Sequence, residues 1–481
     1  MGAGCRLQID APGTSYAILE ARDAIGGTWD LFRYPGIRSD SDLYTFGYLF
    51  RPWTGTRQFA GGEEIRRYIA DTAAAYKVDR RIRFRTRVLA ADWSSATGRW
   101  TVTTDGGPDS ARGTVTCTVL YACTGYYDYA SAHAPEWPGA ADFAGRLVHP
   151  QFWPSDLDCR GRRVVVVGSG ATAVTLVPAL VRQGAAEVTL LQRSPSYVVA
   201  LPSTDPVATR LGRLLPGRAG YRLQRMRSVL LSQAFYALCR RRPGWARALL
   251  RRQAAARVGA PTVAAHFTPD YDPWDQRLCV AADGDLFDVL ASGAAGIVTD
   301  RIDRFTADGL RLVSGRELAA DVVVSATGLR LLPLGGAWLR VDGEPVDLGR
   351  RTAYRGVMLG GVPNFAFCVG YSNASWTLRA DLSSRFVARF ARHLRRHDLA
   401  YGVPHSPDGP GHPLLPLRSG YVLRALDRFP RRGDRAPWTL PQNYLRDATA
   451  MQLARLDTAM TFVSRTALRG ARRPDPVGAG R

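Results

Sequence analysis

Residues 163–174 read Arg163-Val-Val-Val-Val-Gly168-Ser169-Gly170-Ala171-Thr172-Ala173-Val174, and an apolar stretch then runs to Arg182. The unbroken valines predict a central strand of a parallel sheet, because such strands are buried on both faces. A glycine-rich turn between a strand and a helix lets the backbone approach a pyrophosphate, while the helix N-terminus directs unpaired N–H groups at it. The pattern therefore predicts a dinucleotide site at Gly168, Ser169, Gly170, Ala171, Thr172, Ala173 and Val174.

The second strand of this unit, residues 188–191, ends in Gln192-Arg193-Ser194 and not in an acid. An acid there would bind a ribose 2′-hydroxyl and repel a 2′-phosphate, whereas an arginine stabilises that phosphate. We therefore predict NADPH over NADH as the cofactor of this unit. The structural alternative is a surface arginine unrelated to any nucleotide.

A second, incomplete nucleotide unit lies at the start of the chain. The short apolar run 16–19 ends in Glu20, which suits the ribose of a dinucleotide without a 2′-phosphate, such as FAD. Gly2 and Gly4 match the first two glycines of a fingerprint, but Leu7 occupies the third position and no strand precedes them. Because the spacing from Gly4 to Glu20 is too short for a full helix and strand, we expect a truncated, internally shortened first βα unit.

The remaining pattern completes an α/β fold. Apolar periodicity predicts a helix over 64–76, and buried runs predict strands at 82–88, around 100–102 and at 119–123. Arginine-rich amphipathic segments predict a helical insert over about 205–265. The strand and glycine turn at 321–328 repeat the pattern of 119–125, which indicates two related dinucleotide domains.

We therefore expect two Rossmann-like dinucleotide-binding domains, one for FAD and one for NADP, with a helical insert in the second. The expected boundaries are an N-terminal part of the FAD domain over 1–140, a linker over 141–160, the NADP domain over 161–330, and a return to the FAD domain with a C-terminal region over 331–481.

Composition excludes several classes of protein. The chain has 481 residues, enough for two or three domains, and a formal net charge of +22. Lys77 is its one lysine, so the charge is almost all arginine, and no nucleic-acid-binding motif accompanies it. Seven dispersed cysteines without metal-ligand spacing favour reduced thiols and no metal site. Without a signal peptide or a long apolar run we expect a cytoplasmic protein, although the basic insert leaves peripheral membrane contact open.

A further string precedes the glycine-rich turn and reads Phe143-Ala-Gly145-Arg-Leu-Val-His149-Pro-Gln-Phe-Trp153-Pro154. Its FxGxxxHxxxWP spacing resembles the fingerprint of the Baeyer–Villiger monooxygenases, which are class B flavin monooxygenases. Similar segments extend the resemblance over about residues 14–470, namely Gly26-Gly-Thr-Trp-Asp30 with its continuation to Asp40, Tyr271-Asp-Pro-Trp-Asp-Gln-Arg277, and Gly370-Tyr-Ser-Asn-Ala-Ser-Trp376.

The resemblance implies FAD and NADPH as cofactors and O2 as co-substrate. It implies insertion of one oxygen atom into ketones to give esters through a C4a-peroxyflavin, and oxidation of thioamide or sulfide sulfur. By position it implies FAD contacts from Glu20, Thr28, Trp29, Asp30, Leu31, Asp40 and Val88, and NADP contacts from Arg38, Ser39, the 168–174 turn, Gln192 and Arg193. Arg277 matches the active-site arginine of the family.

The chemistry of these residues agrees with such a role. A guanidinium keeps its proton at working pH, so Arg277 can stabilise an anionic peroxide and the oxyanion of its carbonyl adduct. Asp40, beside Arg277, would orient its guanidinium. The structural alternatives are an ion pair for Arg277 and a turn or helix-cap acid for Asp40. For His149 we favour coupling of domain motion to NADPH binding over plain packing, and we assign no catalytic role to Trp153.

Two other functions stay open. The incomplete first turn favours a non-catalytic or defective chain that binds NADP but does not retain FAD. The other alternative is a flavin reductase or oxidase of the same fold. Arg277 and the 143–154 string argue against it, because such an enzyme does not need them. The sequence leaves the physiological substrate and the oligomeric state undetermined.

Overall fold

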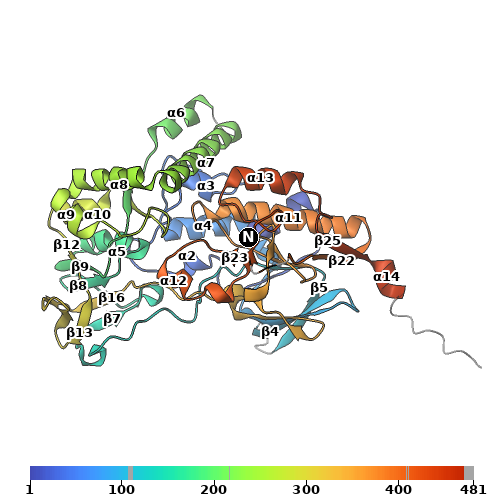
Figure 1. The fold of residues 1–481 in the computed structure, drawn as a ribbon, viewed down its shortest axis with the longest axis horizontal. Coiled ribbons are helices and arrows are strands. Elements are labelled where there is room, and N and C mark those ends of the chain that lie inside the picture. The colour runs from blue at the N-terminus through green and yellow to red at the C-terminus, as the bar shows by residue number, and fades with distance from the viewer. Residues whose placement is uncertain (107–111, 216, 408, 410, 471–481) are drawn as a thin grey trace, which may run out of the picture.

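The structure, a computed structural model, describes residues 1–106, 112–215, 217–407, 409 and 411–470. Figure 1 shows two halves side by side: the first half holds the sheets with β4, β5, β22 and β25, and the second half holds the sheet with β8, β9 and β16. The helices α6, α7 and α8 lie along the upper edge, on the side of the second half. This arrangement is the α/β fold with two nucleotide domains and a helical insert that the sequence predicts.

The predicted nucleotide unit lies in a five-stranded parallel sheet of order β12-β9-β8-β16-β7. Its strands are β7 (Arg146–Val148), β8 (Arg163–Val167), β9 (Glu187–Gln192), β12 (Gly296–Thr299) and β16 (Val322–Ser325). The helices α5 (Ala171–Arg182) and α10 (Asp285–Ala291) contribute apolar side chains to the core on one face. An antiparallel ribbon of β13 (Ile302–Thr306), β14 (Gly309–Leu312) and β15 (Glu317–Ala319) follows β12 in sequence. The predicted strand, turn and helix at 163–182 are confirmed.

β7 comes from the fingerprint string and pairs in parallel with β16. Part of the segment expected to be a linker is therefore an edge strand of the second sheet.

The insert consists of α6 (Pro206–Leu214), α7 (Arg218–Arg241), α8 (Pro243–Val258) and α9 (Ala260–His266). It is bracketed by β10 (Val198–Leu201) and β11 (Cys279–Ala282), which pair in parallel. Asp205 caps α6 by accepting hydrogen bonds from the N–H groups of Val207 and Ala208, which satisfies donors that the first turn leaves unpaired. Exposed apolar side chains on the insert include Leu214, Leu215, Leu223, Leu230 and Trp245. Peripheral membrane contact, which the sequence left open, is not supported by these exposed side chains alone.

The other half contains two larger sheets. One has the order β19-β20-β21-β6, with β6 (Leu120–Ala122), β19 (Ala353–Tyr354), β20 (Met358–Leu359) and β21 (Phe365–Phe367). The other has the order β18-β17-β3-β4-β5, with β3 (Thr86–Ser94), β4 (Arg99–Gly106), β5 (Gly113–Cys117), β17 (Trp338–Val341) and β18 (Glu344–Pro345). Strand β1 (Ile18–Leu19) pairs in parallel with β2 (Ile82–Arg83). The strand expected over 82–88 is divided, because Arg85 has a positive φ of 51° between β2 and β3.

Helices and short ribbons surround these sheets. The helices are α1 (Gly2–Asp10), α2 (Thr28–Leu31), α3 (Leu43–Phe46), α4 (Gly62–Ala75), α11 (Trp376–Arg396), α12 (Gly420–Leu423), α13 (Tyr444–Leu453) and α14 (Arg465–Gly470). The ribbons are β22 (Leu399–Pro404) with β25 (Met460–Ser464), and β23 (His412–Pro413) with β24 (Arg431–Arg432). Single 3-10 turns occur at Asp79–Arg81, Ala140–Asp142, Pro150–Phe152, Pro333–Gly336, Leu348–Arg350 and Leu426–Arg428. The helix predicted over 64–76 corresponds to α4.

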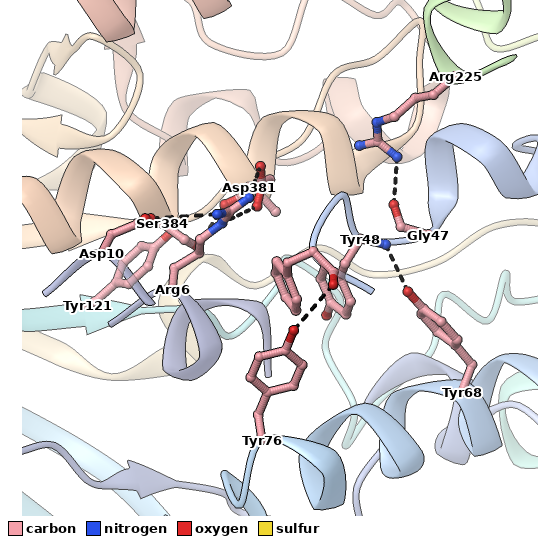
Figure 2. A network of polar contacts seen from close by, with 12 residues as sticks. Arg6, Asp10, Gly47, Tyr48, Tyr68, Tyr76, Tyr121, Arg225, Asp381 and Ser384 are labelled. Atoms are coloured by element: carbon pink, nitrogen blue, oxygen red, sulfur yellow. Dashed lines mark hydrogen bonds and ion pairs between the residues drawn. The ribbon is translucent and has the colours of Figure 1, made fainter. Parts of the chain in front are cut away.

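A buried ion pair joins α1 to α11. Figure 2 shows Arg6 reaching Asp381, with distances of 2.6 Å from Nε to Oδ1 and 2.9 Å from Nη2 to Oδ2. The two side chains are 7% and 6% exposed. Because the geometry is bidentate, the pair fixes the orientation of α1 against α11 as well as its position.

Within the described ranges, no helix has the length and apolar character needed to cross a lipid bilayer. Over the same residues, no cluster of three or more His, Cys, Asp or Glu side chains could hold a metal ion.

Candidate functional site

The turn after β8 has the backbone geometry that a phosphate-binding loop needs. Gly168 has a φ of 144°, and a Cβ there would lie 2.3 Å from the carbonyl oxygen of Ala326. A side chain is thus excluded by the close approach of the strand-end turn after β16. A Cβ on Gly170 would meet no atom within 4 Å, and α5 begins directly after it. The open space ahead of the first N–H groups of α5 suits a pyrophosphate.

The side chains of this turn divide between core and surface. Ala173 and Val174 lie on the buried face of α5 and pack in the core, which leaves only their backbone available to a ligand. The hydroxyl oxygens of Ser169 and Ser196 are hydrogen-bonded at 2.8 Å. Ala171 and Thr172 are half-buried at the start of the helix.

Two residues at the end of β9 have different surroundings. The side-chain amide of Gln192 is buried and donates to the backbone oxygen of His266 at 2.8 Å and to Oγ1 of Thr299 at 2.9 Å. Arg193 is exposed, and no hydrogen bond or ion pair joins its side chain to any described residue. In this arrangement Gln192 ties the insert to β12, while Arg193 is the cation available to a 2′-phosphate; both contacts with NADP stay predictions.

The strap at residues 34–40 belongs to the first half by sequence but is bound to the second half. The hydroxyl of Tyr34 is hydrogen-bonded to the side chains of Thr172 and Thr175 on α5. A Cβ on Gly36 would lie 2.5 Å from the carbonyl oxygen of Thr175. Nη1 of Arg38 lies 2.6 Å from Oδ2 of Asp285 on α10. The strap is therefore anchored to two helices of the second half.

Ser39 and Asp40 follow these anchors. Ser39 is buried, and its N–H donates to the carbonyl oxygen of Ala60 at 3.1 Å. Burial raises the pKa of the Asp40 carboxyl above its ordinary value, while the charges of Arg277 and Arg38 act in the opposite direction. The charges of Arg277 and Arg38 thus act on Asp40, and the orienting role of Asp40 beside Arg277 stays a prediction.

Arg277 lies where several segments of the chain meet. Burial acts to lower the pKa of its guanidinium, but Asp40, Tyr126, Tyr421 and Tyr127 act together to raise it above the ordinary value. A guanidinium in this setting stays protonated at every working pH. The position therefore supplies a fixed positive charge on which Asp40 and three tyrosines act electrostatically.

The backbone just before Arg277 is strained. Trp274 has a φ of 71°, which is unusual for a residue with a bulky side chain. The carbonyl oxygen of the next residue, Asp275, accepts a hydrogen bond from the N–H of Arg418 at 2.8 Å, and its carboxylate pairs with Arg240 at 2.7 Å. Such outliers persist where surrounding contacts over-determine the conformation, which is common at functional sites. Here the contacts fix the direction in which the chain leaves toward Arg277.

The residues predicted to contact FAD come from separate elements. Glu20 follows β1, and its carboxylate accepts a hydrogen bond from the N–H of Arg22 at 2.9 Å. The hydroxyls of Thr28 and Tyr129 are 3.0 Å apart. Asp30 is buried and pairs with Arg22 at 2.5 Å and with Arg33 at 2.7 Å. Asp30 thus holds α2 in place, which leaves its backbone and Thr28 as the groups that could contact a flavin.

The other three residues of this set are apolar. Trp29 packs edge-on against Phe46 with ring centroids 5.9 Å apart. Leu31 packs against the core of the second half, and Val88 lies at a bulge in β3. Their contacts with FAD remain predictions.

The first two glycines of the incomplete fingerprint lie inside a helix. A Cβ on Gly2 would lie 2.9 Å from the ring of Tyr48, and one on Gly4 would lie 2.9 Å from Cγ1 of Val78. Both residues belong to α1 and pack against side chains rather than forming a turn open to a ligand. The described residues therefore fit NADP at the 168–174 turn, and fit FAD at its ribose and flavin ends but not at a first pyrophosphate turn.

The fingerprint string contributes β7 to the second sheet and, through His149, contacts the turn that follows β16. Phe143 is buried, and a Cβ on Gly145 would lie 2.4 Å from its ring and 2.5 Å from the carbonyl oxygen of Asp321. Nδ1 of His149 accepts a hydrogen bond from the N–H of Gln151 at 3.1 Å. The ring proton must then lie on Nε2, which is 3.3 Å from the carbonyl oxygen of Gly328. Trp153 packs against a different core from Phe143, the one that contains Ala173 and Val174, and Pro154 ends the string.

The sequence analysis missed the aromatic residues around Arg277. Tyr126 and Tyr127 follow the predicted strand and glycine turn directly, with ring centroids 4.7 Å apart, so their position near a strand end was the available signal. Tyr421 comes from a distant short helix, α12, and nothing local marks it.

Comparison with known proteins places the chain in a family. The family model described as flavin-binding monooxygenase-like matches residues 56–227. The chain is similar to the FAD-containing monooxygenase EthA of Mycobacterium tuberculosis, with 48% identity over 99% of this chain and 96% of that protein.

Solved structures share the fold. A steroid monooxygenase bound to NADP matches with a TM-score of 0.73 and 21% identity, covering 96% of this chain and 98% of that one. The enzyme OTEMO, in complex with FAD and NADP, matches with a TM-score of 0.68 and 24% identity, covering 84% of each chain.

Proposed function

Because the chain belongs to the family of flavin-binding, FAD-containing monooxygenases, we propose that it is an NADPH-dependent flavin monooxygenase of Baeyer–Villiger type. Its substrates would be ketones, which give esters, and organosulfur compounds such as thioamides or sulfides, with O2 as the oxygen source. The observation that carries the proposal is the guanidinium of Arg277, whose pKa is raised by the charges of Asp40, Tyr126, Tyr421 and Tyr127.

NADPH would bind at the turn after β8. The N–H groups at the start of α5 and the open space at Gly170 suit its pyrophosphate. The exposed guanidinium of Arg193 is available for the 2′-phosphate, which favours NADPH over NADH. Thus the turn would position the cofactor, and Arg193 would select it.

FAD, when bound, would supply oxygen activation, which no protein side chain can perform. Glu20, Thr28 and the backbone of 29–31 would hold its ribose and flavin ends. Arg277 would stabilise negative charge that develops on oxygen during transfer, because its charge is fixed and enclosed. Asp40 would orient the guanidinium without neutralising it.

One observation favours a second function. Since Gly2 and Gly4 are packed inside α1, the described chain offers no first turn for the FAD pyrophosphate. The alternative is a chain that binds NADP but does not retain FAD.

Purification followed by a visible absorbance scan separates the two proposals. The monooxygenase predicts flavin bands that survive gel filtration, and conversion of a test ketone to its ester, or a test sulfide to its sulfoxide, with NADPH. A colourless protein that binds NADPH and gives no oxygenated product even with added FAD would overturn the first proposal and support the second.

A further inference from the structure

Two cysteines lie next to each other at the ends of neighbouring strands. Strands β6 and β21 pair in parallel, with Phe367 opposite Ala122. The N–H of Cys368 donates to the carbonyl oxygen of Ala122 at 2.9 Å, so the ladder continues one residue beyond the strands. Cys123 and Cys368 are the next pair in this register.

Continued by one residue, this register places the two Cα atoms at a spacing that a disulfide can span. Neighbouring strands are about 4.8 Å apart in the hydrogen-bonding direction, and disulfides join Cα atoms about 4.4 to 6.8 Å apart. Side chains opposite each other in a parallel pair point to the same face of the sheet. Cys123 is exposed and Cys368 half-buried, and both are free thiols.

The surroundings make the two thiols unequal. A hydrogen bond from Cys123, followed by contributions from Tyr121 and the charge of Arg379, lowers the pKa of Cys368 below that of an ordinary thiol, against the opposing effect of burial. The same hydrogen bond and burial raise the pKa of Cys123. Tyr121 lies beside α11, where Figure 2 shows it near Ser384, with the two hydroxyls 3.4 Å apart.

The other five cysteines lack this combination. Burial raises the pKa of each of them, namely Cys5, Cys117, Cys159, Cys239 and Cys279. Because the thiolate is the reactive form, the cross-strand pair is the preferred site of oxidation.

We propose that Cys123 and Cys368 form a reversible disulfide in the presence of hydrogen peroxide. The thiolate of Cys368 attacks one peroxide oxygen, the O–O bond breaks, and a sulfenic acid forms. The leaving hydroxide takes up the proton that the thiol had given to solvent, which yields the first water. The thiol of Cys123 then attacks that sulfur, its proton leaves with the hydroxyl as the second water, and the S–S bond forms. The two thiols lose two electrons together, and peroxide is reduced to two waters.

The bridge would alter a cavity that lies at the ends of β6 and β21. Cys368 lines this cavity together with Thr124, Gly125 and Val369. A bond between the ends of β6 and β21 would hold the turn at 124–125 against β21. Oxidation would therefore restrict the segment that leads to Tyr126 and Tyr127.

Thiol counting on the full-length chain tests the proposal directly. Reduced protein is treated with hydrogen peroxide, unfolded in guanidinium, alkylated with N-ethylmaleimide and weighed by intact mass spectrometry. All seven cysteines should be alkylated before oxidation, and two fewer afterwards. Peptide mapping should join the peptides of Cys123 and Cys368, and dithiothreitol should restore the original count.

Variants assign the roles. Cys123→Ser should abolish the bridge and leave a sulfenic acid at Cys368 that dimedone traps, whereas Cys368→Ser should abolish both products. Cys117→Ser is the matched control and should leave the bridge intact. An unchanged thiol count, a bridge between other cysteines or a disulfide-linked dimer would overturn the proposal, and the wild-type mapping gives this answer even if a variant fails to fold.

Discussion

Nε2 of His149 lies 3.3 Å from the carbonyl oxygen of Gly328 and donates its proton to it. The histidine belongs to the string that forms β7, and the glycine belongs to the turn after β16, the neighbouring strand. The contact therefore locks the fingerprint string onto a strand-end turn at the same edge of the sheet as the 168–174 turn. It gives the predicted coupling between this string and NADPH a physical route.

His149 should make stability depend on pH in a defined direction. Burial lowers its pKa below the ordinary 6.5, opposed by the hydrogen bond to Gly328. Below pH 6.5 the unfolded chain then binds more protons at this site, so the free energy of unfolding falls as the pH falls, by at most about 1.4 kcal/mol per pH unit. Urea unfolding between pH 7.5 and 5 should show a shallower decline for His149→Gln than for the wild type. Parallel curves would contradict this assignment.

Gly145 should not tolerate a methyl group. A Cβ there would lie 2.4 Å from the ring of Phe143 and 2.5 Å from a carbonyl oxygen. Gly145→Ala should therefore lower the free energy of unfolding by about 1–3 kcal/mol, as overpacking does elsewhere. The control is Gly244→Ala in α8, where a Cβ meets nothing within 4 Å. Equal denaturation midpoints for the two variants would show that the close approach is absent.

Arg193 should decide between the two nicotinamide cofactors. Loss of a charge-assisted contact to the 2′-phosphate should weaken NADPH binding by about 10- to 100-fold in Arg193→Ala, since such bonds contribute about 1.5–3 kcal/mol. NADH binding should be unchanged. Titration calorimetry measures both, and Arg160→Ala, at an exposed arginine paired with Asp158, is the control. If NADPH affinity stays at the wild-type value, another residue selects the cofactor.

Arg277 should affect the oxygen-transfer step rather than NADPH binding. Removal of one fixed electrostatic stabiliser costs about 100- to 1,000-fold in kcat, so Arg277→Ala in flavin-loaded protein should lose this much product formation. Arg277→Lys should recover only part of it, because an ammonium lacks the planar fork of donors. Arg340→Ala, half-exposed and far along the chain in β17, should behave like wild type. Ester or sulfoxide formation at the wild-type rate in Arg277→Ala would remove the residue from the mechanism.

Removal of one partner of the Arg6–Asp381 pair should lower the free energy of unfolding more than removal of both. Asp381→Ala removes the bidentate partner of a buried guanidinium, with Asp10 at 3.7 Å as the remaining carboxylate, and should cost about 3–5 kcal/mol, whereas the double variant Arg6→Met with Asp381→Leu should cost far less. Chemical denaturation of both variants gives the comparison. Asp158→Ala, which breaks an exposed pair, should leave the midpoint unchanged. A double variant as unstable as the single one would argue against the unpaired charge as the cause.

Local pattern was sufficient to predict the nucleotide unit at 163–194 and the helices of the insert. The valine run, the turn glycines and the arginine-rich periodicity each act within a few residues, so the sequence carries their signal directly. The division of 82–88 into β2 and β3 was missed because a single positive φ at Arg85 has no clear sequence mark.

Long-range pairing accounts for most of what the sequence did not reveal. That Arg146–Val148 adds an edge strand to the second sheet depends on its partner 176 residues further along, as the register of Arg146 with Val322 shows. Burial of the Gln192 amide likewise depends on His266 and Thr299, which the intervening insert brings back. Tyr126 and Tyr127, Tyr421 and Arg277 come from three separate segments, and no local pattern in the sequence connects them.

The anchoring of residues 34–38 to α5 and α10 has a mechanical consequence. Because Gly36 packs closely against Thr175 and Arg38 is paired with Asp285, the strap would follow α5 and α10 if the two halves rotated relative to each other. Leu31 and Phe32 already pack in the core of the same half, so the bending would fall before Leu31. Ser39 is also hydrogen-bonded to Ala60, so such a rotation would pull on the segment that leads into α4.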